Sequence, residues 1–308
     1  MSDRRNLSSN VSAGVSRRQF AAVMGTAAAA AASGSSSARA SAPSKAAEWV
    51  TLGKTGVRVT RLAQGTGFNG SGRSSEHTRI GTRAFTSLVR RDIDLGVTFM
   101  DTADLYGSHQ YLRRALEGIP REKYTILTKI WPRTEYWNAY SGGARAEVDR
   151  FRKELNTDFL EIVLLHCMMN DRWTQDFARG MDELNELKAK GIVKAVGVSC
   201  HDFGALKIAC ASPWVDVILA RINHVGKAAH MDASVEEVVP HLKQAKAAGK
   251  GIIGMKIFGA GRINKPEERD ASLKFVFQNG LVDAVTIGML SEAEVDDTVR
   301  RMDQALAG

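Results

Sequence analysis

The sequence predicts a (β/α)8 barrel for residues 49–308, beginning with an N-terminal β-hairpin. Three observations predict this fold. Short β-branched runs alternate with longer segments of helical period, the alternation occurs eight times, and it fills one stretch of single-domain length. An open dinucleotide-binding sheet is less well supported. The glycine-rich residues 65–72 match its motif only loosely, and no helix is predicted promptly after them.

The elements follow in a regular order from residue 49. Residues 49–60 predict the hairpin, which turns at Gly53–Gly56 and which we expect to cover the barrel floor. Apolar runs predict strands at 61–68, 97–102, 124–130, 159–166, 193–199, 215–222, 251–258 and 283–289. Apolar residues at helical spacing predict helices at 82–95, 109–117, 142–155, 177–190, 202–211, 234–248, 267–279 and 291–306. Glycines stand where helices are expected to end, at Gly96, Gly191, Gly249 and Gly280.

Residues 1–40 have the three parts of a bacterial export signal. The pair Arg17-Arg18 comes first, the weakly apolar run 21–32 follows, and Ala38-Arg39-Ala40 resembles a cleavage site. The arginine pair predicts export by the Tat translocase, and with it a periplasmic or secreted protein. Residues 41–48 are predicted to be a linker. The alternative is an alanine-rich disordered tail with a chance arginine pair.

Composition excludes several other classes of protein. The net charge is +8, and half of it lies in residues 1–40, so the barrel carries too little positive charge to indicate a nucleic-acid surface. No apolar run of membrane-spanning length follows residue 50. Three cysteines predict buried thiols rather than a disulfide framework. The histidines show no metal-ligand spacing, so no metal site is expected.

Ionisable residues follow three consecutive predicted strands. Asp101 ends the second strand and Tyr106 lies in its loop, Lys129 is near the end of the third, and His166 ends the fourth. Reactive groups of such barrels sit at these strand ends, so we expect the four side chains to converge. Asp101 would pair with Lys129, whose ammonium would lower the pKa of Tyr106 and favour proton donation to a carbonyl that His166 orients. The hydride would come from a nicotinamide.

Residues 49–308 resemble the aldo-keto reductase family over nearly their whole length. The resemblance rests on LGKTGVRVTRLAQGTGF, DTADLYG, LTKIW, LLH, KGIVKAVGVSCHD and IGMLSEAEVDDTV. It implies a (β/α)8 barrel that uses NADPH without a metal. It also implies that the family's catalytic tetrad falls on Asp101, Tyr106, Lys129 and His166.

The same resemblance implies a set of cofactor contacts. They fall on Thr66, Gly67, Ser199, Cys200, Phe258, Gly259, Gly261, Arg262, Gly288 and Met289. For residues 258–262, whose backbone amides and Arg262 would face a pyrophosphate, the alternative is a plain glycine turn. Three positions depart from the family pattern. Leu219 stands where the family usually has a glutamine, Met255 replaces an aromatic residue, and Glu294 occupies a position that is usually basic. NADP is therefore expected with NAD as a possibility, because a carboxylate repels the 2′-phosphate.

The sequence thus predicts an NAD(P)H-dependent oxidoreductase that reduces the carbonyl of a small aldehyde or ketone, with Tyr106 as general acid. The alternative is a barrel of this family that binds a nucleotide or a partner without turnover, which the departures favour. A sugar hydrolase is discounted, because Asp101 and Asp104 lie on one loop with no further carboxylate to pair with them. The physiological substrate and the oligomeric state stay open.

Overall fold

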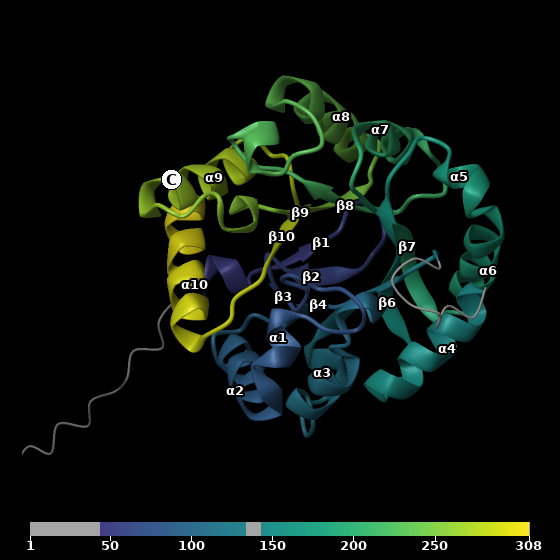
Figure 1. The fold of residues 1–308 in the computed structure, drawn as a ribbon, viewed down its shortest axis with the longest axis horizontal. Coiled ribbons are helices and arrows are strands. Elements are labelled where there is room, and N and C mark those ends of the chain that lie inside the picture. Colours follow the sequence, from purple (N-terminus) through teal and green to yellow (C-terminus); the bar gives the residue numbers. More distant parts are fainter. Residues whose placement is uncertain (1–43, 134–142, 308) are drawn as a thin grey trace, which may run out of the picture. The chain divides into compact units, whose positions relative to one another are not determined.

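Eight parallel strands close into a barrel with helices around it (Figure 1), which confirms the predicted fold. The structure is a computed structural model that describes residues 44–133 and 143–307. Neighbouring strands pair in the order β10-β3-β4-β5-β6-β7-β8-β9. The barrel strands are β3 (Leu62–Gly65), β4 (Phe99–Asp101), β5 (Thr125–Ile130), β6 (Leu160–Met168), β7 (Val193–Cys200), β8 (Val217–Arg221), β9 (Gly251–Met255) and β10 (Ala284–Ile287).

The predicted hairpin is present and packs against the side chains of the barrel interior. Strands β1 (Trp49–Thr51) and β2 (Arg58–Thr60) pair antiparallel, with Val50 opposite Val59. Leu52 and Val59 are fully buried in one apolar cluster with inward-facing strand residues such as Phe99. Leu52 also lies against Gly251, the first residue of β9, where an added Cβ would come within 2.8 Å of the leucine Cβ. The hairpin therefore packs at the N-terminal end of the strands, opposite the end where reactive groups are expected.

The outer helices match the predicted order. They are α2 (Gly81–Asp94), α3 (His109–Ala115), α4 (Ala144–Leu155), α6 (Ala178–Ala189), α7 (Phe203–Ala211), α8 (Val235–Ala247), α9 (Pro266–Gln278) and α10 (Glu292–Ala307). The four glycines expected to end helices all have positive φ, at Gly96 (81°), Gly191 (71°), Gly249 (93°) and Gly280 (63°). This left-handed conformation lets the chain leave a helix at low cost, which explains the glycine at each position.

The structure differs from the predicted elements mainly in short segments. Helices α1 (Glu76–Arg79) and α5 (Trp173–Asp176) are each one turn long, which is too short to show a helical period in the sequence. The 3₁₀ turns η1 (Lys45–Ala47), η2 (Asp104–Tyr106), η3 (Arg121–Lys123), η4 (Gly226–Ala229) and η5 (Gly259–Gly261) are equally short. Strand β9 ends at Met255, before the predicted end at residue 258, because Lys256 has a φ of 59° and leaves the extended conformation.

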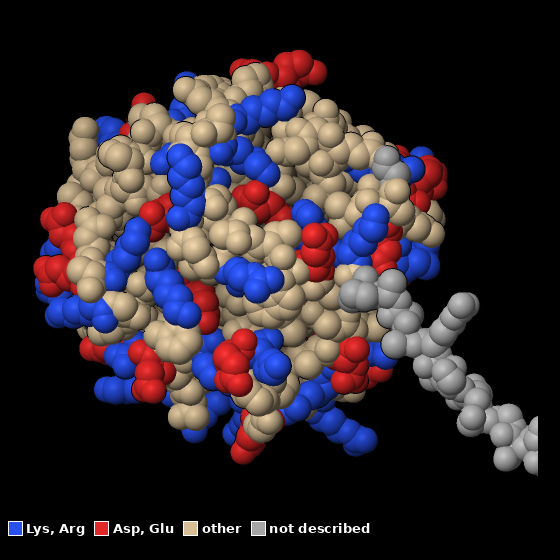
Figure 2. Space-filling model, turned by 180° about the vertical axis from the view of Figure 1, so that it is seen from behind, with Lys and Arg blue, Asp and Glu red and all other residues tan. Residues whose placement is uncertain are grey.

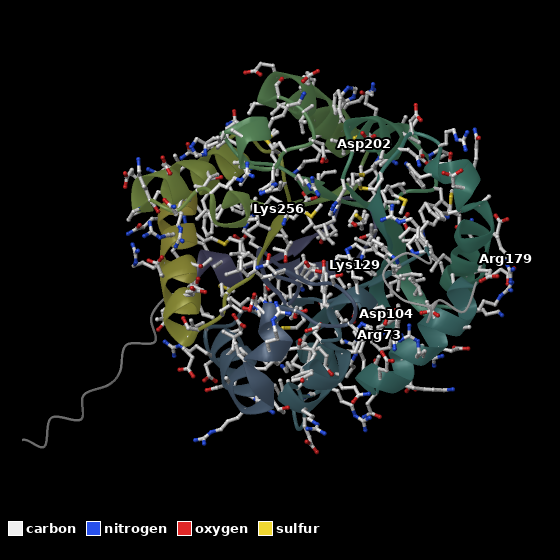
Figure 3. All side chains as sticks on the ribbon, in the orientation of Figure 1. Arg73, Asp104, Lys129, Arg179, Asp202 and Lys256 are labelled. Atoms are coloured by element: carbon white, nitrogen blue, oxygen red, sulfur yellow. The ribbon has the colours of Figure 1, made fainter. Side chains whose placement is uncertain are left out.

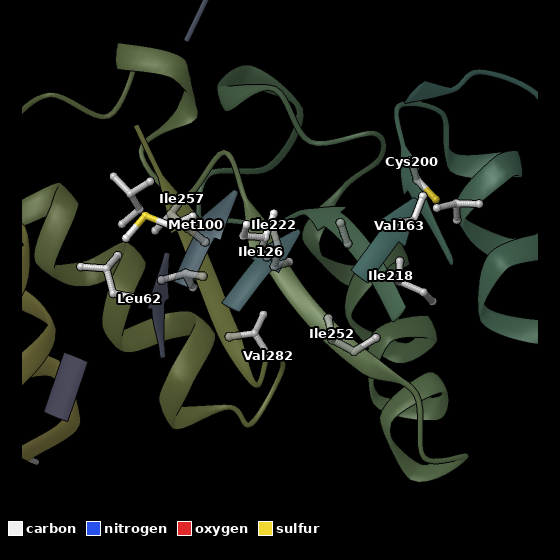
Figure 4. Close-up of a cluster of buried hydrophobic side chains, with 14 of the residues drawn as sticks. Leu62, Met100, Ile126, Val163, Cys200, Ile218, Ile222, Ile252, Ile257 and Val282 are labelled. Carbon is white, nitrogen blue, oxygen red and sulfur yellow. The ribbon is translucent and has the colours of Figure 1, made fainter. Parts of the chain in front are cut away.

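The strands separate two apolar cores. One lies inside the barrel and includes Ile162 and Leu164, and the other lies between the strands and the helices and includes Val163 and Cys200 (Figure 4). The alternation along β6 and β7 follows from the two-residue period of a strand, which turns successive side chains to opposite faces. This period decides which side chains of each strand can reach the barrel mouth.

Two further features concern the termini and the surface. Residues 44–47, predicted to be part of a linker, include η1 and hydrogen-bond to α10, where the Ser44 hydroxyl donates to Asp303 at 2.7 Å. The predicted signal, residues 1–40, lies outside the described residues. The face drawn in Figure 2 carries lysine and arginine side chains intermixed with acidic ones. In the described part of the chain, no helix is both long and apolar enough to cross a membrane.

Candidate active site

A buried ion pair lies at the C-terminal end of the strands. Asp101, the last residue of β4, accepts from the ammonium of Lys129 on β5. The ammonium also donates to the carbonyl oxygen of Thr102 at 2.9 Å, and the other carboxylate oxygen of Asp101 accepts from the Thr286 hydroxyl at 2.8 Å. Lys129 is fully buried. Its charge is therefore neutralised by a carboxylate that is itself held from β10.

Tyr106 is presented by a short loop that two arginines hold in place. It ends η2, and Asp104 at the start of η2 accepts from Arg150 on α4 at 2.8 and 2.9 Å. The guanidinium of Arg73 lies 3.1 Å from the same carboxylate (Figure 3). A bidentate arginine contact fixes both position and orientation, so Asp104 anchors the turn that carries Tyr106.

The phenol of Tyr106 meets the imidazole of His166. The hydroxyl lies 3.3 Å from Nε2 of His166, and the two rings are nearly perpendicular, at 87°. The ammonium of Lys129 lies 4.9 Å from the centre of the Tyr106 ring, so it faces the π system rather than the hydroxyl. The structure thus brings together all four predicted residues, Asp101, Tyr106, Lys129 and His166.

Two glycines give the Tyr106 ring its place. A Cβ added at Gly67 would lie 2.2 Å from Cζ of Tyr106, and one added at Gly70 would lie 2.5 Å from Cδ1. Real side chains do not approach this closely, so only glycine at both positions allows the ring to lie flat against the β3–α1 loop. On the other side, the Trp131 ring packs edge-on against His166 at 5.6 Å between centroids.

Burial sets the protonation states of these groups. It raises the pKa of Tyr106 well above its usual value, and the negative charge of Asp101 adds to this. Burial lowers the pKa of Lys129, against the opposing effect of Asp101. Burial and the nearby Lys129 charge lower the pKa of His166 well below its usual value. The expected lowering of the Tyr106 pKa is therefore wrong for this state of the site, because Asp101 cancels the ammonium and the phenol is desolvated.

A cavity of about 160 Å³ opens beside Tyr106. Four of the predicted cofactor residues line it, namely Gly67, Phe258, Gly261 and Gly288. Gly261 offers open space where a Cβ would stand, and its neighbour Ala260 has a φ of 53°. Bare backbone along a cavity wall suits the close approach of a flat ring and its attached phosphates, so these residues fit a nicotinamide cofactor.

Other predicted cofactor residues are not brought to this cavity. Cys200 is fully buried in the outer core, because it follows the inward-facing Ser199 by one residue and so faces the helices. The Met289 side chain is also in that core. Neither side chain lines the cavity.

The remaining predicted cofactor residues make hydrogen bonds or packing contacts with other residues of the chain. The Thr66 hydroxyl contacts Asp101 O at 2.9 Å, and the Ser199 hydroxyl accepts from the Cys167 amide at 2.7 Å. Gly259 is buried against Ala229, and the Arg262 guanidinium donates to Ala228 O at 2.8 Å. The Ser199 hydroxyl can still donate, whereas the Thr66 hydroxyl contacts both Asp101 O and Ser108.

Sequence reasoning missed several polar residues near the cavity. Lys256 lines it directly, and Arg221, His201 and Asp232 form a connected group beside it. Lys256 and Arg221 each stand at or just after the end of an apolar strand, which was the signal that identified Lys129 and His166. The prediction that β9 continues to residue 258 concealed Lys256. In the described part of the chain, no group of three or more His, Cys, Asp or Glu residues could hold a metal ion.

Several known proteins are similar to this chain in sequence or in structure. YeaE, a methylglyoxal reductase of Escherichia coli, is 30% identical over 156 residues, and this chain spans about half (49%) of its length. L-Galactose dehydrogenase of Arabidopsis thaliana is 24% identical over 284 residues, which cover 80% of this chain and 86% of that protein. The crystal structure of PA4992, a putative aldo-keto reductase of Pseudomonas aeruginosa, matches with a TM-score of 0.70 and 26% identity over 85% of this chain and 98% of that one.

A family match covers most of the barrel. Residues 61–277 match the aldo/keto reductase family, and this range runs from the start of the barrel to the end of α9. It includes Asp101, Tyr106, Lys129 and His166 in the geometry described above. By its sequence and its fold, this chain belongs to the aldo/keto reductase family.

Proposed function

We propose that the protein is an NAD(P)H-dependent oxidoreductase that reduces the carbonyl of a small aldehyde or ketone to an alcohol. The observation that carries the proposal is the Tyr106 hydroxyl, held 3.3 Å from His166 Nε2 beside a cavity with glycine-lined walls. Family membership supports the reaction class, and the related YeaE is named a methylglyoxal reductase. A phenol and a neutral imidazole converging on one space suit a carbonyl oxygen that must receive a proton.

Tyr106 is proposed to be the general acid. Its raised pKa keeps the phenol protonated at neutral pH, so the proton is in place before the carbonyl arrives. Neutral His166 positions the carbonyl oxygen by a hydrogen bond from Nε2, in the tautomer that carries the proton there. As negative charge develops on that oxygen, the phenol gives up its proton. The nearby Lys129 then stabilises the phenolate.

Asp101 is proposed to keep Lys129 charged and in place. Burial alone favours the neutral amine, and the Asp101 carboxylate opposes this effect. Thr286 holds that carboxylate through its second oxygen. The ammonium therefore stays fixed beneath the Tyr106 ring throughout the reaction.

A bound reduced nicotinamide would supply the hydride, since no side chain of this protein can do so. The residues placed to hold it are Gly67, Gly261 and Gly288 with their exposed backbone, and Met255, which lines the same cavity. NADP is proposed as the cofactor with NAD as a possibility. The carboxylate of Glu294 accepts from the Leu290 amide at 2.7 Å, so a negative charge stands at the start of α10. Such a charge disfavours a phosphate nearby, which keeps NAD in consideration.

The test is the variant Tyr106→Phe. We expect kcat/KM for NADPH-dependent reduction of simple aldehydes to fall about 10²- to 10⁴-fold, because a general acid contributes that much. The NADPH dissociation constant, measured by fluorescence quenching, should stay within about twofold, since no cofactor contact is removed.

The same assays separate the alternative function. A wild-type protein that binds NADPH but reduces no member of an aldehyde and quinone panel would be a nucleotide-binding barrel without turnover. The feature favouring that alternative is Leu219, which lines the cavity and cannot hydrogen-bond a carboxamide. Absence of both binding and turnover with either cofactor would contradict both functions.

Export by the Tat translocase is proposed from residues 1–40 alone, together with a periplasmic or secreted location. The pair Arg17-Arg18 supports it. Replacing both by lysine should retain the protein in the cytoplasmic fraction at its full precursor length. Unchanged fractionation of that variant would contradict the proposal.

A further inference from the structure

A lysine stands at the edge of the cavity that contains the Tyr106 hydroxyl. Lys256 directly follows β9 and lines the cavity together with Tyr106, Leu219 and Met255. Its φ of 59° is unusual for a residue with a side chain. Figure 3 shows Lys256 and Lys129 both within the ring of helices. Lys256 therefore lines the same cavity as Asp101 and Tyr106.

Lys256 differs from Lys129 in having no counter-charge among the residues that the structure describes. No hydrogen bond or ion pair joins its ammonium to another residue of the part of the chain that the structure describes. Burial lowers its pKa, and the positive charge of Arg221 lowers it further. A half-buried cation beside a second cation is unfavourable unless an anion binds there.

The acid that contacts Arg221 is already engaged. Asp232 pairs with Arg221 at 3.2 Å, and its side chain is 1% exposed. Arg221 also contacts Nδ1 of His201, whose ring lies 6.4 Å from the His166 ring. These contacts lead from Arg221, whose charge acts on Lys256, towards His166. The cavity edge between them carries more positive than negative charge among its described residues.

We propose that Lys256 binds an anionic group of the carbonyl substrate, so that the enzyme acts on aldehydes or ketones that also carry a carboxylate. The inference rests on the proposed function, since it names the substrate class of the same site. The electrostatic neighbours of Lys256 are Arg221, on β8, and Cys167, next to His166. This is the side on which the carbonyl would lie. The bare backbone at Gly288 follows β10, on the other side of β9 in the barrel.

The experiment compares an acid with its uncharged ester. The substrates are 4-carboxybenzaldehyde and methyl 4-formylbenzoate, which share the reacting aldehyde and ring. In Lys256→Met, kcat/KM for the acid should fall about ten- to hundredfold, because a charge-assisted hydrogen bond is lost. The kcat/KM for the ester should fall less than about threefold. Lys256→Arg should keep the preference for the acid. Lys227→Met is the matched control, because Lys227 is an exposed lysine on the neighbouring η4.

Two binding measurements complete the test. Calorimetry with 4-methylbenzoate, which has no carbonyl or alcohol to react, is done on the protein loaded with NADP⁺. It should show binding to wild type that is lost in Lys256→Met, and this result does not depend on turnover. The NADPH dissociation constant should be unchanged. Equal losses for acid and ester together with weaker NADPH binding would assign Lys256 to the cofactor phosphates and overturn the inference. Turnover of both aldehydes with no effect of Lys256→Met would also overturn it, while leaving the proposed function intact.

One further outcome would support the anion site at Lys256 and contradict the proposed reductase activity. Wild type that reduces neither aldehyde, yet binds the acid through Lys256, would support the anion site and contradict the proposed reductase. Thermal unfolding of each variant should match wild type within a few degrees, and Lys256→Gln serves as a second neutral variant.

Discussion

The two sides of the cavity handle charge in opposite ways. On the side of β4 and β5, Lys129 is fully buried and paired with Asp101, which Thr286 holds in turn. On the side of β8 and β9, Lys256 is half-buried and has no partner among the described residues, while Arg221 takes the nearby carboxylate. The first side is complete without a ligand, and the second has an unneutralised charge.

This difference separates residues that hold the structure from residues that await a ligand. A buried pair with saturated hydrogen bonds keeps its geometry whether or not substrate is present, which suits a group that must position a phenol. An unpaired cation at a cavity edge contributes little to folding and gains when an anion arrives. Removing charge from the two sides should therefore change different quantities, namely stability on one side and binding on the other.

The largest effect is expected from Asp101→Asn, which leaves the Lys129 ammonium buried without its carboxylate. The free energy of unfolding should fall by about 3–5 kcal/mol, the usual result of removing one partner of a buried pair. Urea unfolding followed by circular dichroism measures it. Glu48→Gln is the control, because Glu48 pairs with Arg61 at 2.9 Å but is largely exposed, and it should cost less than about 1 kcal/mol. Equal losses for the two variants would contradict the proposed contrast.

A buried histidine on the β10 side gives the next effect. His77 is fully buried, Nε2 of its neutral ring donates to Met289 O at 2.9 Å, and Nδ1 has no partner among the described residues. Burial lowers its pKa from 6.5 to about 4. Below pH 6.5 the unfolded chain therefore takes up a proton that the folded chain refuses. Stability should fall as the pH drops from about 6.5 to about 4, by roughly 3 kcal/mol from this group.

His77→Gln removes that titration. The difference in unfolding free energy between pH 7 and pH 4 should shrink by about 3 kcal/mol relative to wild type. Urea unfolding at the two pH values checks it, and all other titrating groups are common to both proteins. An unchanged difference would mean that His77 takes up its proton in the folded state, and that this side of the cavity tolerates a charge.

The sequence was sufficient for the barrel and for the convergence of Asp101, Tyr106, Lys129 and His166, because both depend on local patterns. Strand and helix periods are visible in single segments, and polar residues that end apolar strands converge once the strands are parallel. The side chains of Cys200 and Met289 lie in the outer core, and for Cys200 the period of β7 already indicates this once Ser199 faces inward. Lys256 was not identified from the sequence because β9 ends at a residue with a positive φ, which the sequence does not reveal. Whether its ammonium is paired depends on residues that are distant in sequence.

The smallest of the three effects tests the fit of the phenol itself. Gly67→Ala places a Cβ 2.2 Å from Cζ of Tyr106, so the ring must shift from its present position against His166. A displacement of about 1 Å in a reacting group typically lowers the rate about a hundredfold, which is the loss expected in kcat/KM for both the acid and the ester. The matched control is Gly180→Ala in α6, where the nearest atom, a Leu165 methyl, lies 3.9 Å away.

Gly67→Ala also tests whether the two sides of the cavity act independently. Because the substitution disturbs the proton donor and leaves Lys256 in place, the ratio of the two kcat/KM values should stay that of wild type, while both fall together. The acid should still bind to the NADP⁺-loaded variant with its wild-type affinity. A selective loss of the acid would mean that Tyr106 and Lys256 hold the substrate as one unit, and that the two sides are not independent.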